Sequence, residues 1–152
     1  MNTKLFSIAL ALMLGAAYSL TAYSQAKSET LVKQRQAAMT LQGKYWGPLS
    51  GMAQGKVPCD ANVVARNAGY LDALSRMPWD GFAASTKDVK SAALPAVFTD
   101  TAKFKEAQDR LQSEVTRLVS VVKGGDEAAV KAQLAATGKS CGGCHETFRE
   151  KQ

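Results

Sequence analysis

The sequence has little of what disulfide-rich, nucleic-acid-binding and membrane-embedded proteins need. It contains three cysteines and one histidine. Two of the cysteines form a single C-x-x-C pair, so they do not build a disulfide framework. The net charge of +6 is mild, and basic and acidic residues are interspersed rather than gathered in blocks, which argues against nucleic-acid binding. Beyond residue 24, no stretch is long and apolar enough to cross a bilayer.

The first residues have the pattern of a secretory signal peptide. One positive charge, Lys4, precedes an apolar run that extends to about Leu20, and small residues follow up to Ser24. The run is short for a membrane anchor, and no basic stop-transfer cluster follows it. We therefore predict secretion into the periplasm, removal of residues 1–24, no stable membrane insertion, and one mature domain of residues 25–152.

Helical spacing of apolar residues appears four times, and no region shows sustained strand-like alternation. The first helical segment runs from about Ser28, which suits an N-cap, to Met52, and Gly47-Pro48 should kink or end it. The second segment begins after Asp60 and stops at Pro78.

The two remaining segments lie in the C-terminal part of the chain. The third begins at Thr99 or Asp100 and ends at Gly124-Gly125. The fourth is capped by Asp126 and runs almost to the C-terminus.

Residues 78–99 connect the second and third segments. They contain two prolines and no clear period, so we expect a long crossover. Its length favours a functional or cofactor-covering role. Four helices with two short connections and one long crossover predict an all-α fold, a four-helix bundle.

The C-terminal stretch Cys141-Gly-Gly-Cys144-His145 has three interpretations. A zinc site needs four ligands, and only the distant Cys59 is left to complete one. A thiol–disulfide pair usually opens a helix, where the dipole lowers the thiol pKa, but this pair lies late in a helix and outside any βαβ context. Attachment of a c-type haem uses two cysteines one turn apart and the adjacent histidine. We favour haem, with Cys141 and Cys144 as covalent anchors and His145 as the proximal iron ligand.

Three glycines lie close to this motif, at positions 138, 142 and 143. Each costs a helix about 1 kcal/mol relative to alanine. We expect them to interrupt the fourth helix and to make room for something bulky, such as a flat macrocycle.

The choice of a second axial iron ligand is narrow. His145 is the only histidine, so ligation by two histidines is excluded and an ordinary sixth ligand would be a methionine. Met52 and Met77 lie near helix ends and are expected in the core. Met39 lies mid-helix on the inward face of the first segment and is the candidate.

Three stretches together resemble the cytochromes c′ and their class II relatives. They are C-G-G-C-H-E-T-F-R (141–149), R-Q-A-A-M (35–39) and P-W-D-G-F (78–82). The resemblance covers nearly all of the mature chain. It implies an antiparallel four-helix bundle, a homodimer formed through the first two helices, and one five-coordinate haem c with an exposed proximal side and a crowded apolar distal side.

The resemblance also implies roles for individual residues. Arg35 and Gln36 would contact the haem near its propionates, Met39 would occupy the distal position, and Phe82 would help to cover it. Arg149 would stand over the proximal face. Each has a structural alternative: a snorkelling arginine, core packing for Met39 and Phe82, and a solvated C-terminal residue for Arg149.

These residues lead to a functional prediction. No distal histidine can donate a hydrogen bond to bound O₂, and an apolar Met39 would crowd out water and large ligands, whereas NO and CO depend less on a donor. We predict reversible binding of NO and, more weakly, of CO, with one-electron transfer at the iron and a role in NO buffering or detoxification. No base, nucleophile or substrate-positioning group emerges beyond the haem site, so we do not predict an enzyme.

Two other functions stay open at this point. If the Met39 sulfur bound the iron, the protein would be a low-spin Met/His-ligated electron carrier. Without haem, Cys141 and Cys144 would do thiol chemistry. The physiological redox partner is not identified by the sequence. Cys59 is either a small apolar filler or the site of an intermolecular disulfide, and Trp79 is expected to be structural.

Overall fold

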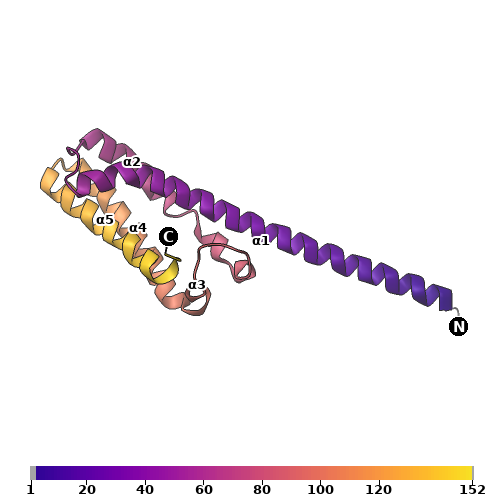
Figure 1. Cartoon of the computed structure of the whole chain (residues 1–152). Helices are drawn as coiled ribbons and strands as arrows, with labels where there is room; N and C mark the ends of the chain where they lie inside the picture. The colour runs from indigo at the N-terminus through magenta and orange to yellow at the C-terminus, as the bar shows by residue number, and fades with distance from the viewer. Residues whose placement is uncertain (1–2, 152) are drawn as a thin grey trace.

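The computed structural model describes the backbone of residues 3–151 and the side chains of residues 24–151. Its long helices are α1 (Thr3–Ala53), α2 (Ala61–Leu74), α4 (Thr101–Lys123) and α5 (Glu127–Phe148). The crossover between α2 and α4 contains three short turns of helix, η1 (Trp79–Phe82), η2 (Ala84–Thr86) and α3 (Ala96–Thr99). Figure 1 shows the long helices side by side, with the N-terminal part of α1 extending beyond the others. The predicted all-α four-helix bundle is confirmed.

The predicted signal peptide, residues 1–24, lies almost wholly outside the described side chains and stays a prediction. Where the structure describes side chains, no helix has the length and apolar character needed to cross a membrane.

The four long helices pack as a closed ring. α1 contacts α2 and α5, and α4 contacts α2 and α5. Contacts between α4 and α5 fix their direction: the rings of Phe104 and Phe148 lie 5.1 Å apart, and Gln133 donates to the carboxylate of Glu114 at 2.6 Å. A residue early in α4 therefore meets one late in α5, which makes the two helices antiparallel.

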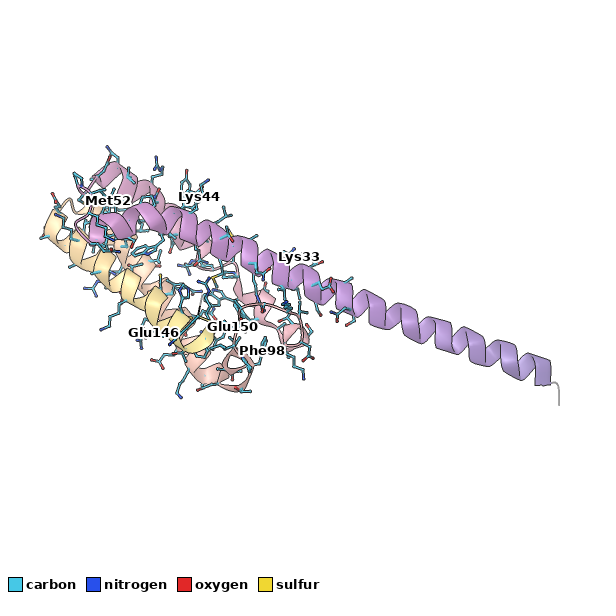
Figure 2. The ribbon with its side chains drawn as sticks, in the orientation of Figure 1. Lys33, Lys44, Met52, Phe98, Glu146 and Glu150 are labelled. Atoms are coloured by element: carbon cyan, nitrogen blue, oxygen red, sulfur yellow. The ribbon has the colours of Figure 1, made fainter. Side chains whose placement is uncertain are left out.

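One end of the bundle is filled by an apolar core, and we call it the packed end. The residues of this core come from all four long helices and are Leu49, Met52, Val64, Ala68, Leu71, Val115, Leu118, Val130 and Leu134. Figure 2 labels Met52 at this end and Glu150 towards the other. Burying a large aliphatic side chain contributes roughly 1.5–3 kcal/mol, so this cluster is the main source of the bundle's stability.

Aspartates cap the N-termini of α2 and α5, as the sequence predicted. Asp60 accepts hydrogen bonds from the backbone N–H groups of Asn62 and Val63, at 2.9 and 3.1 Å, at the start of α2. Asp126 does the same for Ala128 and Ala129, at 2.9 and 3.3 Å, at the start of α5. These bonds satisfy N–H groups that have no partner inside the helix.

The predicted start of the first helix at Ser28 was wrong, whereas its predicted end near Met52 is confirmed. Ser28 lies inside α1, where its hydroxyl donates to the Ser24 carbonyl at 3.1 Å instead of capping. Pro48 lies inside α1 as well, and the helix continues to Ala53. The residues just beyond the proline, Leu49 and Met52, are buried in the core, and this burial offsets the hydrogen bond that proline cannot donate.

Two further expectations were wrong. α5 is one uninterrupted helix in spite of its three glycines. Met77 is 60% exposed and does not join the core, although Met52 does. Met77 follows the end of α2, where the chain leaves the bundle to form the crossover, so it has no helix face to pack against.

Replacing Asp126 with alanine should lower the free energy of unfolding by about 1 kcal/mol, because the first turn of α5 loses its side-chain acceptor. Urea unfolding followed by circular dichroism measures the change. Asp126→Asn keeps an acceptor at the same place and should retain most of the stability. Equal losses in both variants would mean that the negative charge, rather than the hydrogen bonds, matters.

Candidate functional site

The other end of the bundle encloses a cavity of about 690 Å³. We call it the cavity end. Its walls come from all four long helices and the crossover. All eight residues predicted for the site line this one cavity: Arg35, Gln36, Met39, Phe82, Cys141, Cys144, His145 and Arg149. Leu71 and Val115 belong to both the core and the cavity wall, so the cavity begins where the packed end stops.

Cys141, Cys144 and His145 share the side of α5 that lines the cavity. Burial raises the pKa of the Cys141 thiol to about 11 and also raises the pKa of Cys144. Redox-active and nucleophilic cysteines need the opposite shift, so the thiol alternative loses support. Partial burial, with the charge of Arg149, lowers the pKa of His145. A neutral imidazole is the form that binds a metal.

The zinc alternative also loses support. Across the part of the chain that the structure describes, no three His, Cys, Asp or Glu side chains gather where they could hold a metal ion. Cys59 precedes α2 and packs against the core at the packed end, so it cannot complete a site with Cys141 and Cys144. This position agrees with Cys59 as an apolar filler.

Arg35 is buried on α1, with 4% of its surface exposed. Its guanidinium donates to the carbonyl of Gly81, to the hydroxyl of Thr86 at 3.2 Å and to the hydroxyl of Ser91 at 2.7 Å. It also lies over the ring of Phe82, 4.4 Å from the centroid. Burial lowers the pKa of Arg35 from its very high ordinary value. The observed partners of this arginine are therefore oxygens and a ring of the crossover.

The chain was compared with known families and structures. The family model described as "Cytochrome C'" matches residues 30–149. The cytochrome c′ of Rubrivivax gelatinosus is 41% identical over 121 residues, which cover 79% of this chain and 94% of that protein. This chain belongs to the cytochrome c′ family.

Solved structures of the family have the same fold. Cytochrome c prime from Shewanella frigidimarina is 32% identical with a TM-score of 0.77, over 82% of this chain and 97% of that one. A variant of the Alcaligenes xylosoxidans protein with bound NO is 31% identical with a TM-score of 0.74, over 82% and 97% of the two chains. A carbon-monoxide-bound variant of the same protein is 33% identical with a TM-score of 0.74, over 83% and 98%.

Cytochromes c′ carry one covalently bound haem c with its iron, and the cavity of this chain fits that cofactor. Its volume lies within the range of about 300–1,000 Å³ typical of ligand sites. Two cysteines on one helical face, a histidine next to them and a largely apolar wall form the set of side chains that a covalently attached haem needs.

Four aromatic side chains continue the cavity wall, and the sequence assigned only Phe82 among them to the cofactor. Trp79 and Phe104 lie 5.8 Å apart, Phe82 and Phe104 4.9 Å, and Phe104 and Phe148 5.1 Å. The indole N–H of Trp79 donates to the Ser75 carbonyl at 2.6 Å. Phe104 and Phe148 lay on the inward faces of their helices, but helical spacing does not say which inward residues border a cavity.

Only one of the three motif-region glycines has a close neighbour. A Cβ on Gly138 would lie 2.9 Å from the ring of Trp46, whereas Cβ atoms on Gly142 and Gly143 would meet nothing within 4 Å. Trp46 also lines the cavity. The expected bulky neighbour of Gly138 is therefore an indole ring of α1.

If Cys141 and Cys144 anchor the haem, the double variant Cys141→Ser/Cys144→Ser should show no haem stain on a denaturing gel, because only a covalent bond survives denaturation. Periplasmic expression with the haem-attachment machinery and peroxidase staining give the measurement. Cys59→Ser is the matched control and should stain as strongly as the wild type. Stain retained by the double variant would contradict the assignment.

Proposed function

We propose that this cytochrome c′ binds NO, and CO more weakly, and that it buffers or detoxifies NO in the periplasm while exchanging single electrons. The NO and CO complexes of the Alcaligenes xylosoxidans protein support gas binding by a close structural relative. The observation that carries the proposal in this chain is that Met39 and Phe82 line the same cavity as the haem-attachment residues.

The residues of the cavity have separate roles in this proposal. Cys141 and Cys144 hold the cofactor on α5, and His145 binds its iron. When bound, haem c supplies an iron that takes a small neutral ligand and changes its charge by one electron. Met39 and Phe82 restrict the space on the wall formed by α1 and the crossover, which favours compact ligands over large ones.

Selectivity against O₂ follows from the side chains of the chain. Its single histidine is the proposed iron ligand, so none remains to donate a hydrogen bond to bound O₂. The buried guanidinium of Arg35 donates to the crossover. A ligand that depends on a nearby donor should therefore bind less well than NO or CO.

A low-spin electron carrier is a second candidate, and Met39 is the observation that favours it. Met39 is half-buried and is the methionine that lines the cavity among residues 24–151. A thioether bound to the iron would raise its reduction potential and suit electron transfer. It would also occupy the position that a gas would take.

Export and assembly belong to the same proposal. Removal of residues 1–24 would leave residues 25–152 as a periplasmic domain. A homodimer through α1 and α2 is supported by Leu41 on α1, which is 41% exposed, and by Tyr70 on α2, which is 46% exposed. Homodimer interfaces are more apolar than the rest of the protein surface. We propose no enzymatic turnover beyond gas binding and electron exchange.

The spectrum of the ferrous holoprotein should decide between the two candidates. If Met39 does not bind the iron, the spectrum is broad and high-spin and shifts when NO or CO is added. Met39→Ala should then bind CO faster, because the wall loses the side chain that restricts access. Met39→Leu keeps an apolar side chain of similar size and should behave more like the wild type.

The opposite result is equally clear. Sharp low-spin bands that do not change with gas, but become high-spin in Met39→Ala and Met39→Leu alike, would make Met39 the sixth ligand. The protein would then be an electron carrier, and the gas-binding proposal would be wrong.

A further inference from the structure

A single side chain of α1, that of Arg35, makes three hydrogen bonds to the crossover. The guanidinium donates to a backbone carbonyl at Gly81 and to hydroxyls at Thr86 and Ser91. These acceptors span residues 81–91, half of the crossover. Hydrogen bonds from an ionised donor are about twice as strong as those between neutral groups. One buried side chain therefore holds a long segment that has little helix of its own.

Gly81 brings the crossover unusually close to α1. A Cβ at this position would lie 2.5 Å from Cβ of Arg35 and 2.7 Å from the carbonyl oxygen of Leu31. Only glycine fits such an approach without a shift of the backbone. η1 therefore packs directly against α1, one helical turn before Met39. This contact places the ring of Phe82 against the guanidinium of Arg35.

The other half of the crossover is attached to the end of α5. The N–H of Glu150 donates to the carbonyl of Ala92 at 2.9 Å, and the N–H of Leu94 donates to the carbonyl of Phe148 at 3.0 Å. Ser91, the last residue held by Arg35, is adjacent to this backbone pairing. The crossover therefore reaches from α1 to α5 and forms one wall of the cavity, with Phe82, Ser91, Ala92 and Ala93 among the lining residues.

We propose that Arg35 is a positioning residue that holds the crossover closed against the cavity and thereby limits the rate at which ligands reach it. Only the effect on the rate of ligand entry rests on the proposed gas-binding function; the attachment of the crossover by Arg35 does not. Without the guanidinium, residues 81–91 keep the short turns of η1 and η2 but lose these three hydrogen bonds to α1, while residues 92–94 stay paired with α5. The wall that includes Phe82 would then open from one side.

A substitution at Thr86 distinguishes this positioning role from a direct contact between Arg35 and the cofactor. Its side chain is buried, accepts from Arg35 and does not line the cavity. Thr86→Val keeps the shape of the side chain but removes the acceptor for Arg35, and with it the donation of this hydroxyl to the carbonyls of Gly81 and Ala83. An effect of this substitution on ligand access must therefore pass through the crossover. Ser91→Ala removes a second acceptor of the same guanidinium.

The experiment combines two measurements on holoprotein: CO association after flash photolysis, and hydrogen–deuterium exchange of the backbone amides of residues 81–91. Arg35→Gln should speed CO association by about tenfold, the factor that corresponds to roughly 1.4 kcal/mol. Thr86→Val and Ser91→Ala should each speed it less, and neither should add to Arg35→Gln, because all remove the same attachment. Amide exchange should rise in residues 81–91 and stay unchanged in the middle of α4.

Arg110→Gln is the matched control, because it removes an exposed arginine that pairs with Glu106 on the same helix, α4. It should leave both measurements unchanged. If Arg35→Gln changes the spectrum or the reduction potential while Thr86→Val and Ser91→Ala change neither CO association nor amide exchange, Arg35 acts on the cofactor directly and the proposal is wrong.

The two proposals can fail independently. If the wild type does not bind CO, the gas-binding function fails, and amide exchange still decides whether Arg35 holds the crossover. If Arg35→Gln does not fold, Thr86→Val and Ser91→Ala carry the test, and unchanged exchange in both would overturn the inference.

Discussion

The buried guanidinium of Arg35 joins α1 to the long crossover, whose regular structure is limited to short turns of helix. A buried charge is costly unless its donors are satisfied, and here the acceptors come from one carbonyl and two hydroxyls of the crossover. The same hydrogen bonds therefore offset the cost of burying the charge and hold the crossover in place. The position of Phe82 and the shape of the cavity follow from them.

The cavity can exist because the opposite end of the bundle is tightly packed. The core from Leu49 to Leu134 holds all four helices together, so the cavity end need not contribute its own apolar core. Phe104 contacts Trp79, Phe82 and Phe148 edge to face on the cavity wall, an arrangement favoured by the charge distribution of aromatic rings. The wall is thus stabilised by its own contacts and stays apolar.

Helical geometry places the three residues of the C-x-x-C-H motif on the side of α5 that lines the cavity. Cys141 and Cys144 are one turn apart, and His145 follows directly, so one face of α5 presents all three. Burial raises the pKa of both thiols and lowers the pKa of the imidazole. These side chains suit a covalent cofactor and an iron ligand, and they do not suit thiol exchange. Membership of the cytochrome c′ family agrees with this chemistry.

The sequence by itself determined the four helices, the aspartate caps of α2 and α5, and the C-x-x-C-H motif, because apolar spacing, capping and such a run are all local properties of the chain. It also identified the eight side chains that meet in the cavity, with the help of the family resemblance. It did not determine that α1 continues through Pro48, that Met77 is exposed, or that Phe104 and Phe148 border the cavity. Nor did it show that Arg35 binds Gly81, Thr86 and Ser91. Tertiary structure decided these features, because each depends on which faces meet across the bundle, and residues 46 to 56 positions apart come together only when the whole domain packs.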